Sequence, residues 1–150
     1  MPPMRYLIPC VLLTTAASGS PLAAQAPDSA RAYQRATAGV REFALGPLAV
    51  KVLIDAATLG GGELELAEIT FPSETGAGGG AHRHTRVEVI YILSGEMDHV
   101  VNDVTHHLVP GMVGIVRPGD QVAHRVTSTS PVRALVMWAP GGELPRIEPR

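Results

Sequence analysis

The 150-residue chain lacks several features that would place it in a common functional class. Its lysines and arginines are scattered and its formal net charge is −2, so it has no basic stripe of the kind that nucleic-acid binding requires. It also contains no Gly-x-Ser-x-Gly elbow, no dinucleotide-binding fingerprint and no pair of carboxylates placed for glycoside hydrolysis. We therefore expect no nucleic acid as a partner, and any chemistry must come from another kind of site.

The apolar run near the N-terminus is too short to cross a bilayer as a mature helix. Residues 6–17, YLIPCVLLTTAA, follow the positive start Met4-Arg5 and precede small residues, a pattern typical of a signal peptide. The alternative, a buried N-terminal helix, is disfavoured because prolines and a glycine would interrupt it. We expect residues 1–24 to be a signal peptide, cleaved after residue 24 or 26, which leaves a periplasmic or secreted protein without membrane attachment.

Cys10 is the only cysteine, and it lies within the predicted signal peptide. The mature chain would therefore have no thiol with which to form an internal disulfide, attack a substrate or bind a metal. It would begin with a polar, alanine-rich arm, residues 25–47, for which the sequence leaves two interpretations open. The arm is either a short helix or a loose segment that packs on the domain or on a second copy of it.

From residue 48 onward the sequence is typical of a single all-β domain. Short runs of Val, Ile and Leu alternate with turn-forming glycine, proline and asparagine pairs. The expected strands are AVKVLI, ELELAEITF, VEVIYIL, EMDHVV, VTHHL, MVGIV, QVAHRV and RALVMWA. This spacing predicts a sandwich or small barrel over residues 48–142, followed by a C-terminal tail of residues 143–150. Trp138 in the last strand is interpreted as a core residue.

One stretch, GAHRHTRVEVIYILSG, places a lone glutamate inside an apolar run. In a continuous strand, His82, His84 and Glu88 would all point to the same face. A buried carboxylate is costly unless it is paired or bound to a metal, and imidazoles with a carboxylate suit Zn, Fe, Mn, Ni or Cu. Glu88 is therefore predicted to bind a metal together with the two histidines.

A fourth candidate ligand lies further along the chain. His124 shares a strand face with Val122 and Val126, so it is predicted to point inward. A lone inward histidine is more often a satisfied core residue than a ligand. Because three other candidate ligands are present, we include His124 in the predicted metal site.

The hairpin that contains His99 and His106 allows two interpretations. A two-residue turn at Asn102-Asp103 would place His99 opposite His106 on the more apolar face of the hairpin. In that position both rings would line the cavity beside the metal as proton donors or substrate contacts, which makes them the candidate catalytic residues. The alternative is a solvated hairpin whose histidines have no function.

These motifs resemble those of the cupin superfamily over about residues 48–142. The pattern Gly76-x5-His82-x-His84-x3-Glu88-x6-Gly95 is similar to the first cupin motif, and Pro118-Gly119 followed by His124 is similar to the second. The resemblance implies a double-stranded β-helix, or jelly-roll barrel, whose mouth holds a divalent metal on these three histidines and the glutamate. One departure is that four residues, 120–123, separate the second-motif glycine from its histidine, where two are usual.

The resemblance also implies a function. It favours a metal-dependent enzyme of dioxygenase type that acts on a small organic molecule. The alternative is an exported protein that binds a metal or a small ligand without turnover, since this barrel serves many activities. We also expect a homodimer, because a small barrel leaves sheet edges and an apolar face that a second copy commonly covers.

Overall fold

The computed structural model describes residues 41–59, 62–73 and 80–150. The predicted signal peptide and the arm up to residue 40 lie outside these residues. Within the described ranges, no helix is both long and apolar enough to span a membrane.

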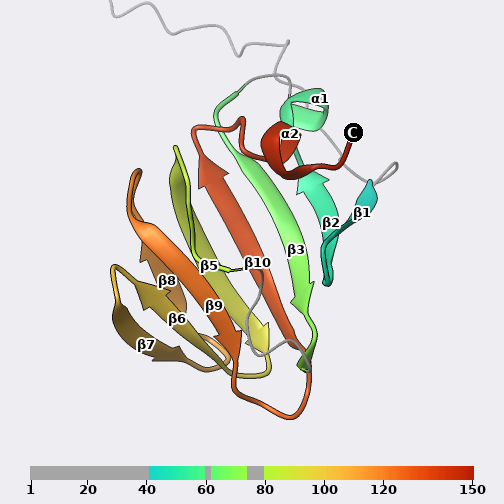
Figure 1. Cartoon of the computed structure of the whole chain (residues 1–150). Helices are drawn as coiled ribbons and strands as arrows, with labels where there is room; N and C mark the ends of the chain where they lie inside the picture. The colour runs from blue at the N-terminus through green and yellow to red at the C-terminus, as the bar shows by residue number, and fades with distance from the viewer. Residues whose placement is uncertain (1–40, 60–61, 74–79) are drawn as a thin grey trace, which may run out of the picture. The chain divides into compact units, whose positions relative to one another are not determined.

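The described residues form two antiparallel β-sheets, as Figure 1 shows. The six-stranded sheet has the order β1 (Glu42–Leu45), β2 (Leu48–Ile54), β3 (Glu65–Phe71), β10 (Val132–Ala139), β5 (Val87–Ser94) and β8 (Val113–Val116). The four-stranded sheet has the order β4 (His82–Arg83), β9 (Gln121–Val126), β6 (Met97–Val101) and β7 (Val104–Leu108). Two short helices, α1 (Ala56–Leu59) and α2 (Leu144–Ile147), accompany them. The predicted all-β fold is confirmed, and each of the eight expected segments forms a strand.

Strict alternation along the central strands builds the core. In β3 and β10 every second side chain is buried, as expected for strands with one face toward the interior. The core cluster contains Ile69 and Phe71 from β3, Ile90 and Ile92 from β5, and several residues of β10. On the same inward face, the strand register places Trp138 of β10 directly between Glu65 and Glu88 of its two neighbours. Two buried acids therefore flank one indole ring in a single row across the sheet.

The hairpin between β6 and β7 has the predicted turn. Asn102 and Asp103 both have positive φ angles, 49° and 66°, as a type I′ turn requires. The resulting register pairs His99 with His106, as predicted. β9 lies on the other side of β6 and pairs His124 with His99, so three imidazoles form a row across this sheet.

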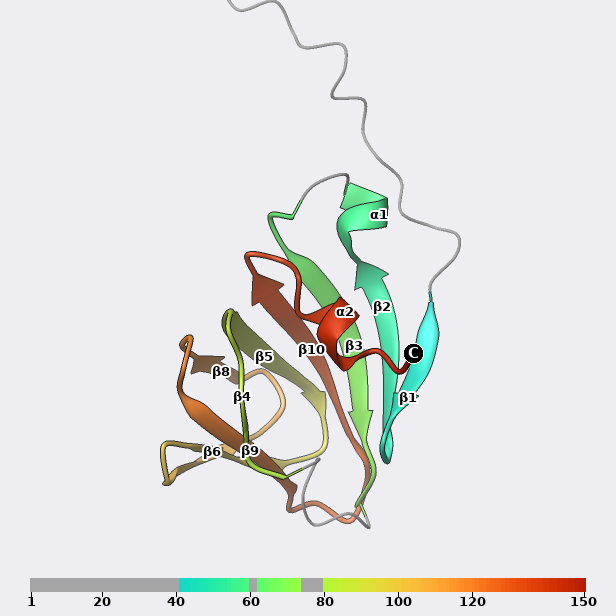
Figure 2. The ribbon, with the colours of Figure 1, turned by 45° about the horizontal axis from the view of Figure 1, so that its top comes forward.

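The stretch that contains the first-motif histidines is not one continuous strand, so the shared face expected of a continuous strand does not apply to it. β4 ends at Arg83 and pairs with β9, whereas β5 begins at Val87 and pairs with β10 and β8 (Figure 2). The chain therefore crosses from one sheet to the other at residues 84–86. The crossing is held by the backbone N–H of Gly119, which donates to the carbonyl oxygen of His84 at 3.0 Å.

The structure shows how both ends of the domain fold, which the sequence did not predict. The described part of the N-terminal arm forms β1, which pairs with β2, so here the arm is neither a helix nor a loose segment. In the C-terminal tail, Leu144 is fully buried and belongs to the core. The tail is therefore an integral part of the domain.

An apolar strip lies on the outer face at one sheet edge. Tyr91 of β5 pairs with Val113 of the edge strand β8, and Ile115 follows on the same face. All three side chains are exposed. A second copy would cover such a strip in the predicted homodimer, which stays a prediction.

A partly buried ion pair between Arg41 and Asp55 lies at the start of the described domain, and Arg41 links it to the C-terminal end. Oδ2 of Asp55 accepts a 2.6 Å hydrogen bond from Arg41, and its Oδ1 caps α1 by accepting the backbone N–H groups of Ala57 and Thr58 at 3.0 Å each. Arg41 also contacts Glu148 after α2 at 2.8 Å. The hydrogen bond from Arg41 holds the pKa of the Asp55 carboxyl below its usual range.

We predict that Asp55→Asn lowers the free energy of unfolding by about 0.5–1 kcal/mol at pH 7, since the amide oxygen keeps the cap but loses the ion pair. Because the folded-state pKa of Asp55 is lowered, this stabilisation is present above the unfolded-state pKa of about 4 and is lost as the pH falls through the folded-state value. Urea unfolding at pH 7 and at about pH 2–3 measures both effects. The control Glu42→Gln alters an exposed carboxylate 3.9 Å from Lys51 and should change stability by less than about 0.5 kcal/mol. A deficit for Asp55→Asn that is constant with pH would contradict the account.

Candidate metal centre

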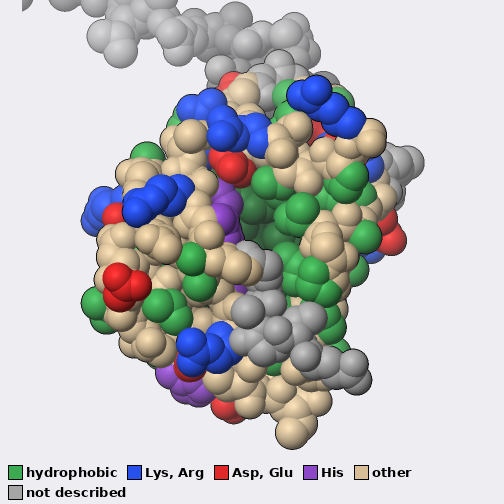
Figure 3. Space-filling model, viewed as in Figure 1, with side chains coloured by type: hydrophobic (Ala, Val, Ile, Leu, Met, Phe, Trp, Pro, Cys, Tyr) green, Lys and Arg blue, Asp and Glu red, His purple; other side chains and the backbone are tan. Residues whose placement is uncertain are grey.

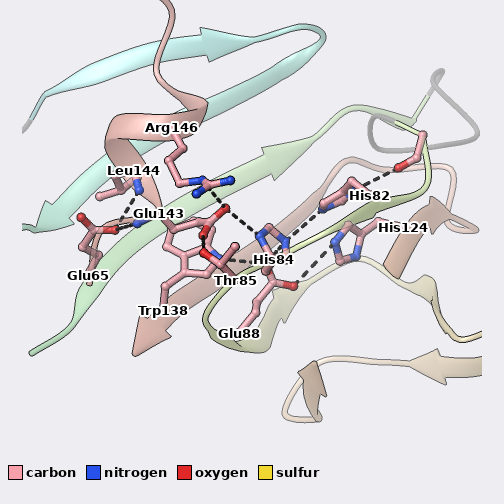
Figure 4. Close-up of polar contacts among 11 residues, drawn as sticks. Glu65, His82, His84, Thr85, Glu88, His124, Trp138, Glu143, Leu144 and Arg146 are labelled. Atoms are coloured by element: carbon pink, nitrogen blue, oxygen red, sulfur yellow. Dashed lines mark hydrogen bonds and ion pairs between the residues drawn. The ribbon is translucent and has the colours of Figure 1, made fainter. Parts of the chain in front are cut away.

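The structure brings the four predicted ligands together (Figure 4). Nε2 of His82 lies 3.0 Å from Nε2 of His84, which in turn lies 2.9 Å from Oε2 of Glu88. Nε2 of His124 lies 3.8 Å from Oε1 of Glu88, and the His124 ring centroid is 5.8 Å from that of His82. Three imidazole Nε2 atoms and one carboxylate therefore face a common region.

Segments of both sheets supply these side chains. His82 of β4 pairs with Val122 of β9, and His124 lies two residues further along the same face of β9. Glu88 comes from the facing sheet, and His84 from the crossing between the sheets. The unusual spacing before His124 is taken up by a turn, in which the backbone N–H of Asp120 donates to the Arg117 carbonyl oxygen. β9 then begins at Gln121 and delivers the ring to the site.

In His82 and His84, the hydrogen-bond partner of Nδ1 determines which ring nitrogen carries the proton. Nδ1 of His82 lies 3.0 Å from the carbonyl oxygen of Gly80, and Nδ1 of His84 lies 3.1 Å from Oε1 of Glu143. A carbonyl and a carboxylate oxygen only accept hydrogen bonds, so each Nδ1 carries the proton and donates it. In the neutral rings both Nε2 atoms are therefore bare, and their lone pairs face each other and the Glu88 carboxylate. Such an arrangement is repulsive unless a cation, either a proton or a metal ion, lies between them.

The pKa shifts agree with a site that holds positive charge beside Glu88. Burial lowers the pKa of His84, but hydrogen bonds and charge from Glu88 and Glu143 outweigh it and raise that pKa above its ordinary value. Burial would raise the pKa of Glu88, yet the His84 hydrogen bond and the neighbouring charges lower it to about 2. Burial lowers the pKa of His124 to about 4, so this ring is neutral near pH 7 and free to act as a ligand.

Glu88 is held by a partner that the sequence did not reveal. Trp138 is buried in the core, as predicted, and its Nε1–H also donates to Oε2 of Glu88 at 3.0 Å. Oε1 of Glu88 is buried and has no hydrogen-bond partner in the described structure. A buried carboxylate oxygen without a partner is costly, and a cation between Glu88 and His124 would satisfy it.

As the side chains stand, no group of three or more His, Cys, Asp or Glu residues in the described ranges is arranged around an ion. The distances explain why. Two ligands of a tetrahedral ion, each at about 2.1 Å, lie about 3.4 Å apart. The His82–His84 and His84–Glu88 pairs are closer than this, at distances that fit a proton between the two atoms, so an ion must take the place of that proton to bind. The donor set fits such an ion, with three neutral imidazoles and a carboxylate.

The prediction that His99 and His106 both line the cavity was wrong. His106 is exposed because β7 is the edge strand of its sheet, and four of its five residues lie in solvent. His99 is 1% exposed and lies behind His124, with 3.3 Å between their Nδ1 atoms. Burial lowers the pKa of His99, so the ring is neutral there. His99 therefore packs against His124 and supports that ring. A catalytic role for His99 stays a prediction.

A cavity of about 460 Å³ adjoins the four ligands. The candidate ligands form one wall, and Figure 3 shows apolar side chains across the hollow from histidine. The apolar lining residues are Leu45, Pro47, Leu48, Ile69, Phe71, Val136, Trp138 and Ile147. The cavity is large enough for a small organic molecule with an apolar body.

The site also contains a carboxylate that sequence reasoning missed. Glu143 contacts His84 from the C-terminal segment, 59 positions away in the chain, and no motif or periodicity marks it. Glu65 was detectable in part, because strand alternation places it on the same face as Ala67 and Ile69.

Comparison with known proteins agrees with this architecture. A family profile described as "Cupin domain" matches residues 70–138, while no curated protein sequence matches the chain. An RmlC-like cupin from Shewanella frigidimarina superposes with a TM-score of 0.59 at 21% identity, over 69% of this chain and 86% of that one. A predicted oxalate decarboxylase from Thermotoga maritima gives 0.58 at 18% identity, over 67% and 91%. The polyketide cyclase RemF from Streptomyces resistomycificus gives 0.53 at 25% identity, over 62% and 65%.

Residues 70–138 therefore match the cupin-domain profile, and the domain has the cupin fold. The two sheets are those of a cupin β-sandwich, and the matched residues include all four candidate ligands and Trp138.

We predict that the bond between Trp138 and Glu88 contributes about 1.5–3 kcal/mol to stability, the range for hydrogen bonds to buried charged groups. A double-mutant cycle of Trp138→Phe and Glu88→Leu, in which leucine removes the acceptor, isolates this coupling from the loss of indole volume. Urea unfolding of the four proteins in the presence of a chelator gives the value without a contribution from metal. A coupling energy near zero would mean that the indole only fills space.

Proposed function

We propose that the protein is a metal-dependent enzyme that acts on a small organic molecule in the adjoining cavity. His82, His84, Glu88 and His124 would hold one divalent transition metal, whose identity among Fe, Mn, Zn, Ni and Cu is open. One observation carries the proposal: imidazole nitrogens without a proton and the Glu88 carboxylate face one another around one point. Nothing in the described residues other than a cation would relieve that arrangement.

The position of the site supports an enzyme. A metal ion held there would act as a Lewis acid toward an oxygen atom of a bound molecule. The chain supplies the remaining requirements. The apolar wall would bind the body of the molecule and exclude water, and His82, the most exposed of the four candidate ligands, also lines the cavity.

The reaction that we favour is dioxygenation, with dioxygen as the co-substrate. The likeness to a polyketide cyclase at 25% identity supports a second class, in which the bound molecule is rearranged without an oxidant. A third candidate is a binding protein that holds a metal or ligand without turnover, and it is supported by the burial of three of the four candidate ligands. Export through residues 1–24 remains part of the proposal, so the protein would act in the periplasm or outside the cell.

We predict that the mature protein, purified without a chelating column, carries about one divalent transition metal ion per chain. The double variant His82→Ala/His84→Ala should lose it, because two of the four ligands are removed. Elemental analysis by mass spectrometry measures the metal content.

The matched control for this experiment is His106→Ala/His107→Ala. It removes the same number of imidazoles from exposed positions of β7 and should retain the metal. Equal metal content in both double variants would refute the site.

We further predict that the metal-loaded protein consumes dioxygen when supplied with a turnover substrate from a panel of small enols and organic acids. One dioxygen should disappear for each substrate molecule converted, as followed with an oxygen electrode and product mass spectrometry. Product formation that is equal under nitrogen would instead support the oxidant-free class. Saturable binding of panel compounds without any product would contradict the enzyme and support the binding protein.

A further inference from the structure

We propose that Glu143 is a positioning residue of the metal centre, and that the segment following β10 is therefore part of the functional site. This inference rests on the proposed metal site. The segment lies beyond residues 70–138, the part of the chain that matches the family profile.

Glu143 is placed as a buried hydrogen-bond acceptor for one ligand. Its side chain is almost fully buried, and its Oε1 lies 3.1 Å from Nδ1 of His84. Its Oε2 accepts from the Thr85 hydroxyl at 3.5 Å. The nearest arginine, Arg146, lies 3.9 Å away and is largely exposed, so it forms no strong ion pair with Glu143. The hydrogen bond to His84 is its main interaction (Figure 4).

A second buried acid fixes the backbone that carries Glu143. Oε2 of Glu65 accepts the backbone N–H groups of Glu143 and Leu144, both at 2.8 Å. Glu65 is 2% exposed and belongs to the inward row that also contains Trp138 and Glu88. Gly141, two residues before Glu143, donates its N–H to the carbonyl oxygen of Gly62, which precedes β3, at 2.7 Å. The start of α2 is thus attached to β3 by two hydrogen bonds, and a third holds the segment just before it.

These contacts form a continuous line from the sheet to the ligand. Glu65 holds the backbone at residues 143 and 144 in place, and this backbone positions the Glu143 carboxylate. The carboxylate in turn keeps the proton of His84 on Nδ1. The ring then presents a bare Nε2 toward Glu88 and His82. Without the acceptor, the tautomer with its proton on Nε2 becomes accessible, and that tautomer cannot bind a metal through Nε2. Outer acceptors of this kind typically change metal affinity by about 10–100-fold.

The test compares Glu143→Leu with Glu143→Gln and with the control Glu148→Leu. Leucine removes the acceptor, whereas glutamine keeps an oxygen that can accept from Nδ1–H. Glu148 lies on the same segment and pairs with Arg41, so its replacement removes an equal charge without touching His84. Nitrogen-15 NMR of metal-free protein, at a pH where His84 is neutral, reads the tautomer, and competition with a chelator reads the affinity for Zn²⁺.

We expect the parent, Glu143→Gln and Glu148→Leu to keep the proton of His84 on Nδ1. Glu143→Leu should populate the Nε2–H tautomer and bind Zn²⁺ at least about 10-fold more weakly than Glu148→Leu. Glu65→Leu, which removes the acceptor of the two backbone N–H groups and does not touch His84, should shift the tautomer in the same direction, and it serves as the second test if Glu143→Leu does not fold. An unchanged tautomer in both variants would overturn the inference. Failure of the parent to bind Zn²⁺ would instead count against the metal site, while the tautomer measurement would still judge Glu143.

Discussion

Three imidazole nitrogens and a carboxylate that face one another require a positive charge between them. In this domain the requirement arises because the protons of His82 and His84 are held on the outer nitrogens by acceptors. In the metal-free chain the same arrangement raises the pKa of His84 and lowers that of Glu88, because a proton on His84 supplies the positive charge. A proton satisfies it in part, but it leaves one Glu88 oxygen without a partner in the described structure. A divalent ion would satisfy all of it, which is why we place the metal at this point.

The fold supports the site with rows of side chains that cross the sheets. In the six-stranded sheet, one row joins Glu65, Trp138 and Glu88, so the same inward face supplies a candidate ligand, the donor that orients it and the acid that anchors α2. In the four-stranded sheet, a second row places His99 behind His124. Each candidate ligand is therefore backed by a fixed polar group, as is common for metal centres. The cavity is lined by the four candidate ligands and also by Glu143 and Trp138.

The sequence predicted those features that depend on short-range patterns. Alternation located the strands, and Asn102-Asp103 fixed the hairpin register, because a type I′ turn leaves one pairing. The ligand set followed from the spacing of the histidines around Glu88. What failed depended on contacts between distant segments. The break after Arg83 exists because β4 and β5 join different sheets, and the exposure of His106 follows from the position of β7 at an edge. The role of Glu143 could not be predicted, because its partner lies 59 positions away.

The most direct test of this account is a crystal structure of the metal-loaded protein, with anomalous scattering recorded at the absorption edge of the bound element. The account predicts a single strong anomalous peak per chain at about 2.0–2.3 Å from Nε2 of His82, His84 and His124 and from a carboxylate oxygen of Glu88. Both outer nitrogens, on His82 and His84, should keep their present acceptors. A peak bound by fewer than three of these side chains, or a fully loaded protein whose ion lies elsewhere, would contradict the central claim.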